Sequence, residues 1–186
     1  MTAYLDPTSM RVYELFGGAI TVSLAGDYLD ASNFRQVPDN QEVLLSNDAG
    51  VSVIVEVLQR VSTGTDESVM DHAVRYHFDS LAHDNSALKS EVAWVDAPSA
   101  AAPEGATPTP ALLQGVQRVQ KFGKAENESD VNIYVAVWRL PSKNVDLVMS
   151  LNDPERTSQS IGEAFRAAAA SLRIRDWGPV SYTHLR

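Results

Sequence analysis

Residues Val131 to Leu140 decide the fold class, and their sequence is VNIYVAVWRL. Successive side chains of a β-strand point to opposite faces, so this run divides into two sets. One set is Val131, Ile133, Val135 and Val137, and the other is Asn132, Tyr134, Ala136 and Trp138. Both sets are largely apolar, which is typical of a strand covered on both faces. The stretch therefore predicts a central strand of a sheet.

The flanking sequence predicts further strands and two helices. Strands are expected at residues 11–15, 19–24, 41–45, 51–58, 90–95, 112–122 and 145–151. One helix should open at Thr65 to Glu67, with an apolar stripe made by Met70, Val74, His77 and Leu81. A second should run from about Ser158 to Ile174, with a stripe made by Ile161, Phe165, Ala168 and Leu172. Clustered strands and widely separated helices predict an α+β fold, with a mostly antiparallel β-sheet flanked by α-helices.

The length and composition are those of a soluble globular protein. The chain has 186 residues, of which 44% are hydrophobic and 21% are charged. We expect a single domain at residues 11–178, flexible termini at 1–10 and 179–186, and a monomer. The segment 97–110 is rich in Pro and Ala and is interpreted as a mobile loop within that domain. No apolar run approaches the ~20 residues of a membrane span, and we expect no secretory signal at the N-terminus.

The net charge of −9 bears on the class of partner. Nucleic-acid binding draws mainly on basic contacts to phosphate, so an acidic chain argues against nucleic acid. A surplus of acid favours a basic protein partner, because opposite charges speed and orient the encounter. Plain solubility explains the same charge equally well.

The sequence offers no catalytic or metal-binding pattern. The chain has no cysteine, which excludes thiolate metal sites and a cysteine nucleophile, and it has no Gly-x-Ser-x-Gly. His72 and His77 are five apart and cannot share a metal on one helix face, so His77 is predicted to be a packed, hydrogen-bonded core residue. Gly17-Gly18 lacks a phosphate-loop pattern and predicts a bend or bulge in an edge strand. We expect no enzyme activity, cofactor or metal.

Acidic residues gather in and after a loop between two predicted strands. Asp27, Asp30, Asp39 and Glu42 fall within sixteen positions, and Glu56 lies on the next strand. Asp30 is also suited to cap one helical turn at residues 30–34. A solvated surface and a surface that faces a partner both remain open for these residues.

Several motifs together resemble the Ran guanine-nucleotide release factor family. They are Leu15–Ala19, Asp30–Ser32, Arg35, Val37–Val43, Ser52–Glu56, Arg75–Phe78, Leu140-Pro141 and Asp146–Val148 with Asn152. The resemblance implies an antiparallel sheet flanked by helices, a PsbP-like α/β/α sandwich. It also implies binding to the small GTPase Ran, promotion of guanine-nucleotide release and support of nuclear protein import, in nucleus and cytoplasm.

The resemblance further implies a Ran-binding surface, which we call the predicted Ran-binding set: Asp30, Asp39, Gln41, Glu42 and Glu56. The chain departs from the family at Gln59, where a second acid is common, and Arg60 follows it. Residues 181–186 match nothing expected of the family. An alternative is a PsbP-like assembly or interaction module that shares only the fold. A hydrolase would need an activated nucleophile that the sequence does not indicate.

Overall fold

The computed structural model describes residues 9–47, 50–62, 69–98, 103, 105–120, 127–154 and 160–180. Its main element is a seven-stranded sheet in which every neighbouring pair is antiparallel. In spatial order the strands are β3 (Tyr28–Asp30), β4 (Gln41–Ser46), β5 (Ser52–Gln59), β9 (Val145–Asp153), β8 (Glu128–Leu140), β7 (Ala111–Gln120) and β6 (Lys89–Asp96). The predicted interior strand is confirmed, because β8 lies between β9 and β7.

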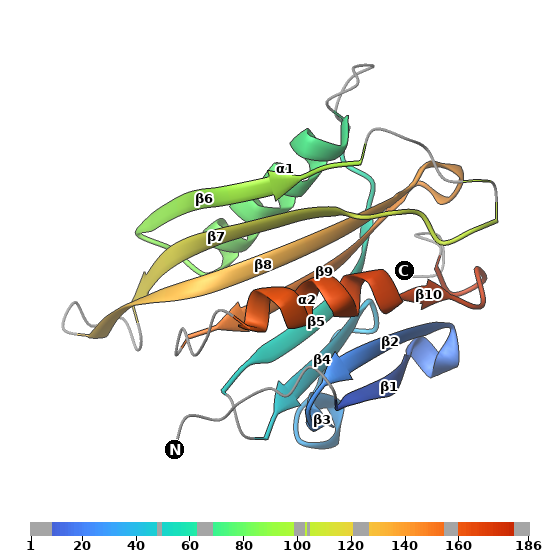
Figure 1. The fold of residues 1–186 in the computed structure, drawn as a ribbon, viewed down its shortest axis with the longest axis horizontal. Helices are drawn as coiled ribbons and strands as arrows, with labels where there is room; N and C mark the ends of the chain where they lie inside the picture. Colours follow the sequence, from blue (N-terminus) through green and yellow to red (C-terminus); the bar gives the residue numbers. More distant parts are fainter. Residues whose placement is uncertain are drawn as a thin grey trace.

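The two faces of the sheet are covered by different layers (Figure 1). Helix α1 (Val69–Asp84) lies behind β6 and β7 and packs chiefly against β6, β7 and β8. Its buried residues Val74 and Phe78 join Val135 and Val137 of β8 in one apolar cluster. The predicted opening of this helix at residues 65–67 lies outside the described residues.

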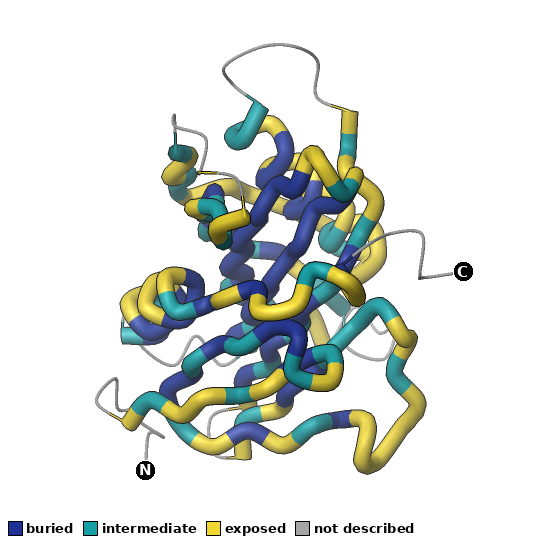
Figure 2. The backbone as a smooth tube through the Cα atoms, turned by 90° about the vertical axis from the view of Figure 1, so that its right-hand side faces the viewer, coloured by how far each residue is buried: buried dark blue, intermediate teal, exposed yellow. Residues whose placement is uncertain are grey.

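The opposite face is covered by helix α2 (Ser160–Ser171) and a second, three-stranded sheet. That small sheet has the order β1 (Met10–Leu15), β2 (Ile20–Ala25) and β10 (Arg173–Ile174). Its apolar side chains and those of α2 form the larger core cluster with Tyr134 and Trp138 of β8. Buried residues gather along the strands in the middle of the molecule (Figure 2). The predicted α+β class is confirmed.

The predicted end of the second helix was wrong. Helix α2 ends at Ser171, and Arg173-Ile174 pairs with Ile20-Thr21 as a third strand of the small sheet. Leu172 remains fully buried, so the apolar stripe continues past the last helical residue. A helical pattern therefore does not mark this boundary, because Leu172 continues the apolar stripe although it lies between α2 and β10.

Phe16, Gly17 and Gly18 form a tight turn that joins β1 to β2. All three have positive φ angles, of 52°, 66° and 91°. Glycine tolerates this region because it has no Cβ, whereas Phe16 must be held there by its surroundings. The glycines were expected in a bend or bulge of an edge strand. They instead form the connection that follows the edge strand β1.

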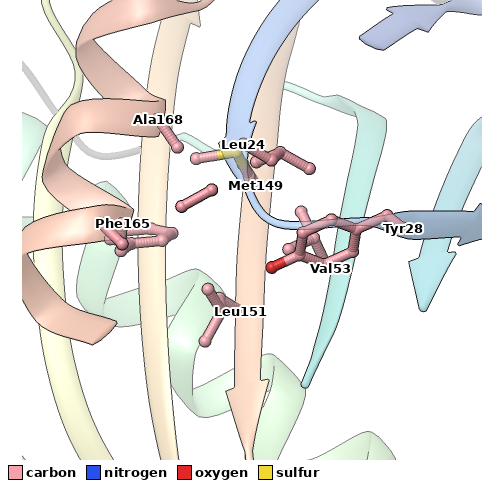
Figure 3. Close-up of a pocket in the computed structure, with 9 residues that line it drawn as sticks. Leu24, Tyr28, Val53, Met149, Leu151, Phe165 and Ala168 are labelled. Carbon is pink, nitrogen blue, oxygen red and sulfur yellow. The ribbon is translucent and has the colours of Figure 1, made fainter. Parts of the chain in front are cut away.

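The core between α2 and the two sheets is closely packed (Figure 3). The cavity there has a volume of about 10 Å³ and is lined by apolar side chains such as Leu24, Met149 and Phe165. A space of ~10–15 Å³ is the least that holds one water molecule, so this cavity is too small for a ligand. No helix among the described residues is both long and apolar enough to cross a membrane.

Candidate functional site

Two members of the predicted Ran-binding set meet on neighbouring strands. Gln41 on β4 lies directly opposite Glu56 on β5 in the antiparallel register. The Gln41 Nε2 donates a hydrogen bond to Glu56 Oε1 at 2.5 Å. On β9 the residue paired with Glu56 is Val148, which belongs to the apolar cluster under α1. Glu56 therefore lies on the face of the sheet that α1 covers. The pair therefore lies on the α1 side of the large sheet.

Glu42 lies on the opposite face of the same strand. It pairs with Val55, whose side chain belongs to the core under α2 and the small sheet. Its Oε1 accepts a hydrogen bond at 2.6 Å from the backbone N–H of Phe16. That amide belongs to the turn in which Phe16 has a φ of 52°. The carboxylate thus connects β4 to the β1–β2 turn.

The other two members have separate positions. Asp30 caps the short turn at Ala31–Asn33, because its Oδ1 accepts a hydrogen bond at 2.8 Å from the Ser32 N–H. This confirms the predicted cap. Asp30 lies opposite Leu44 and shares the face of Glu42. Asp39 is exposed in the turn before β4. The structure therefore does not gather the five residues in one cluster, since Asp30 and Glu42 lie on one face and Gln41 and Glu56 on the other.

Burial makes both glutamates harder to ionise. The pKa of Glu42 is raised from 4.5, first by burial and also by the nearby Asp30, while the Phe16 hydrogen bond acts in the opposite direction. The pKa of Glu56 is raised from 4.5 mainly by burial and also by Asp84, while the Gln41 hydrogen bond and His77 oppose the rise. Desolvation disfavours the charged form of a carboxyl group, which accounts for the direction.

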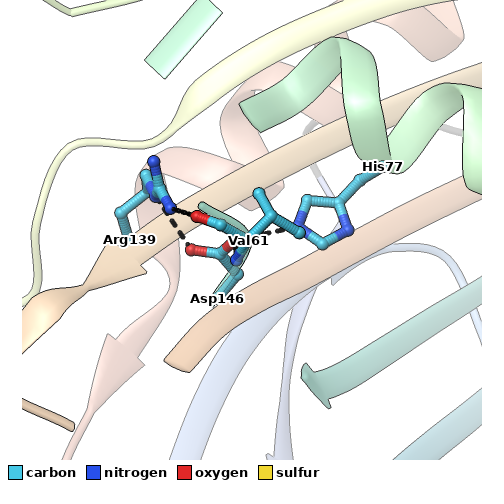
Figure 4. A network of polar contacts seen from close by, with 4 residues as sticks. All are labelled: Val61, His77, Arg139 and Asp146. Carbon is cyan, nitrogen blue, oxygen red and sulfur yellow. Dashed lines mark hydrogen bonds and ion pairs between the residues drawn. The ribbon is translucent and has the colours of Figure 1, made fainter. Parts of the chain in front are cut away.

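A buried polar network joins β8, β9 and helix α1 to the segment that follows β5 (Figure 4). Asp146 on β9 is fully buried and accepts from His77 Nε2 and from Arg139 Nε, each at 3.0 Å. It also accepts from the Val61 N–H at 3.1 Å, and the Arg139 guanidinium donates to the Val61 carbonyl. His77 is confirmed as a packed, hydrogen-bonded residue. Through Val61, the network holds the segment that follows β5 against α1 and β9.

Sequence reasoning missed Asp146 and Arg139 as partners. The available signal was a charged residue beside an apolar run in each of two strands, Arg139 after residues 133–138 and Asp146 before residues 147–149, since charges are rarely buried unless paired. A surface hollow of about 560 Å³ opens next to the network. Its lining includes Leu58, Gln59, Arg60, Tyr76 and His77. Gln59 and Arg60, where the chain departs from the expected family pattern, therefore border an open surface.

Comparisons with known proteins identify the family. Residues 13–154 match the family described as Ran-interacting Mog1 protein. The Ran guanine nucleotide release factor of Danio rerio is 35% identical over 181 residues, which cover 88% of this chain and 96% of the relative. The nuclear import protein mog1 of Schizosaccharomyces pombe is 38% identical over 155 residues, covering 80% of this chain and 79% of the relative.

A solved structure agrees with this assignment. The crystal structure of the Saccharomyces cerevisiae Ran-binding protein Mog1p matches with a TM-score of 0.71 and 25% identity. The match covers 91% of this chain and 97% of that one. The chain belongs to the family of Ran-interacting Mog1 proteins.

Proposed function

We propose that this protein binds the small GTPase Ran, promotes release of its guanine nucleotide and supports nuclear protein import, and that it is present in both nucleus and cytoplasm. The observation that carries the proposal is the similarity to the Danio rerio Ran guanine nucleotide release factor over nearly the whole of both chains. The acidic net charge agrees with it, because acid favours a basic protein partner.

A release factor must weaken the contacts by which a GTPase holds its nucleotide. GTPases hold the phosphates with a lysine and backbone amides, and hold Mg²⁺ with a Ser/Thr hydroxyl and an aspartate. Glu56 is suited to interfere with these contacts. Its carboxylate is half-buried and is oriented by Gln41, and Leu58, two residues further along the same strand, lines an open surface hollow. Pairing with the lysine or displacing the Mg²⁺ would loosen the nucleotide.

This activity requires no covalent chemistry from the protein. Release of a nucleotide is a change in a binding equilibrium, and coupled equilibria are reciprocal. If this protein lowers the affinity of Ran for nucleotide by some factor, nucleotide must lower the affinity of Ran for this protein by the same factor. One copy of the chain bound to one Ran is sufficient for the effect.

Charge reversal at Glu56 tests the proposal. We expect the wild-type protein to speed dissociation of a fluorescent guanine nucleotide from Ran, and Glu56→Lys to lose about tenfold or more of that effect, which corresponds to about 1.4 kcal/mol. Glu91→Lys is the matched control, because Glu91 is exposed on β6 at the opposite edge of the large sheet from β3. Equal acceleration by a folded Glu56→Lys variant would reject the role of this carboxylate.

A further inference from the structure

The segment that precedes β7 contains two Thr-Pro dipeptides. They are Thr107-Pro108 and Thr109-Pro110, and a serine or threonine followed by proline occurs nowhere else in the chain. Residues 107–110 form no helix or strand, and neither proline has an N–H to donate to a sheet. The residue before a proline prefers an extended backbone. Both threonines therefore lie outside regular structure, in a stretch whose prolines favour the extended form in which protein kinases bind their substrates.

The Thr107 side chain contacts the edge strand β10 of the small sheet. Its Oγ1 accepts a hydrogen bond at 2.9 Å from the Ile174 N–H. On its other side β10 pairs with β2, the central strand of that sheet. Thr107 is half-buried, whereas Thr109 is exposed. The two threonines thus share a sequence motif but differ in their surroundings.

Two arginines flank the residue to which Thr107 is bonded. Arg173 precedes Ile174 and Arg175 follows it, and both arginines are exposed while Ile174 is buried. Successive side chains of an extended chain alternate in direction, so the two arginines lie on one face. A group attached to Thr107 Oγ1 would begin at the backbone between them. Two guanidinium groups are therefore placed near the Thr107 hydroxyl.

Both arginines keep hydrogen-bond donors for a further group. The Arg173 Nη1 donates to the carbonyls of Ala170 and Leu172, at 2.7 and 2.8 Å. These carbonyls lie at the end of α2, and the cation there offsets the unfavourable effect of a helix C-terminus on an anion. The Arg175 Nε donates to Thr21 Oγ1 at 3.4 Å. Since a guanidinium has five N–H donors, each arginine can also bind an anion.

We propose that Thr107 is a phosphorylation site for a proline-directed protein kinase, and that Arg173 and Arg175 hold the phosphate. In the transfer, Thr107 Oγ1 forms a bond to the γ-phosphorus of ATP, and the bond from that phosphorus to the β,γ-bridging oxygen breaks. ADP leaves, and the hydroxyl proton passes to the catalytic aspartate of the kinase. The inference is independent of the proposed function, because it uses none of the predicted Ran-binding set.

Phosphorylation fastens the segment before β7 to the small sheet. Phosphothreonine carries a charge of about −1.5 to −2 and three strong acceptor oxygens. These oxygens replace the single hydroxyl acceptor at the Ile174 N–H and add charge-assisted hydrogen bonds to the two guanidinium groups. Asp176 follows Arg175 in the chain, but its Oδ1 accepts from the Gly178 N–H at 2.9 Å. The phosphorylated protein is therefore more stable than the unmodified one.

Two matched variants of the full chain separate the threonines. Thr109→Ala keeps only the Thr-Pro at Thr107, and Thr107→Ala keeps only the other. Each is incubated with MgATP and a proline-directed kinase that phosphorylates a Thr-Pro peptide, and mass spectrometry locates the phosphate. We expect the Thr109→Ala variant to be phosphorylated at Thr107, with a rise in melting temperature of about 2–4 °C. Phosphate at the exposed Thr109 of the Thr107→Ala variant should leave the melting temperature unchanged.

Substitution of the arginines tests what holds the phosphate. Arg173→Gln together with Arg175→Gln, added to the first variant, should still accept phosphate but lose the rise in melting temperature. The control is Arg35→Gln with Arg60→Gln, two exposed arginines elsewhere, which should retain the rise. Absence of phosphate at Thr107 in the first variant overturns the modification site. A melting temperature that does not rise, or a rise that survives the loss of both arginines, overturns their role.

Discussion

Glu42 and the backbone N–H of Phe16 are joined at 2.6 Å across 26 residues of sequence. This contact ties the first residue of a turn with positive φ angles to the second residue of strand β4. The hydrogen bond also offsets the cost of placing a glutamate near the core, since burying a polar group costs free energy unless the group is hydrogen-bonded.

A pair of substitutions separates the charge of Glu42 from its hydrogen bond. Glu42→Gln keeps an oxygen acceptor for Phe16, so we expect near wild-type stability and nucleotide release. Glu42→Ala removes the acceptor and should cost about 1 kcal/mol of unfolding free energy, with a parallel loss of release activity. Urea denaturation and release kinetics on both variants provide the measurements. A Gln variant that is as inactive as the Ala variant would assign Glu42 a direct role through its charge.

Asp146 should be essential for stability. Its removal takes away the buried carboxylate to which the Arg139 Nε donates, and the Arg139 side chain is itself only 7% exposed. Breaking a buried ion pair from one side typically costs about 3–5 kcal/mol. We expect Asp146→Ala to lose that much in chemical denaturation. Asp71→Ala, which breaks the exposed pair with Arg75, should cost less than about 1 kcal/mol. Equal losses in the two variants would show that the buried network does not stabilise the fold.

Gly115 on β7 allows close contact between the sheet and α1. A Cβ at this position would lie 2.3 Å from Phe78 Cζ and 2.6 Å from the Glu91 backbone oxygen. The second contact is with main chain, so a side-chain adjustment cannot relieve it. We expect Gly115→Ala to destabilise the protein by about 1–3 kcal/mol, the usual cost of overpacking. Gly17→Ala serves as the comparison, because its cost arises from a positive φ and not from a clash. Unchanged thermal stability of the Gly115→Ala variant would contradict the packing described here.

Acidification should weaken Ran binding before it weakens the fold. The pKa of Glu56 is raised by burial, so this carboxylate gains a proton at a higher pH than an ordinary glutamate. A raised pKa means that the folded state binds the proton more tightly than the unfolded state. The stabilisation from this group is therefore full below the ordinary value of 4.5 and is lost as pH rises through the raised value.

The corresponding measurement is the Kd for Ran as pH falls from 7 toward 5, with the melting temperature recorded in parallel. We expect the wild-type Kd to weaken across this window. The Glu56→Gln variant should bind more weakly at pH 7 and show a shallower pH dependence, because it has no proton to gain. Parallel pH profiles for the two proteins would show that Glu56 does not titrate in binding.

Pattern in the sequence was sufficient for six strands of the large sheet, but not for its edge strand β3 or for the arrangement around the sheet. The strand at Val131–Leu140 is apolar on both faces, and this alone places it in the interior. The strand at Arg173-Ile174 has two residues, which is too short for alternation to show. The small sheet was therefore missed as a separate unit.

The division of the acidic residues between two faces was also beyond the sequence. Gln41 and Glu42 are adjacent in a predicted strand, so alternation puts them on opposite faces, but which face each one takes and the contact of Gln41 with Glu56 depend on the strand register. Register follows from which residues pair across strands, and a single sequence does not specify those pairs. For the same reason the sequence does not predict the contact between Asp146 and His77, which are 69 residues apart.

Binding of this protein to Ran and binding of nucleotide to Ran should oppose each other. The measurement is the Kd of this protein for nucleotide-free Ran and for Ran bound to GDP or GTP, together with the nucleotide affinity of Ran at saturating protein. We expect nucleotide to weaken the complex of this protein with Ran, and the protein to weaken nucleotide binding by the same factor. Equal affinity for all three forms of Ran, with no change in nucleotide affinity, would contradict the proposed function.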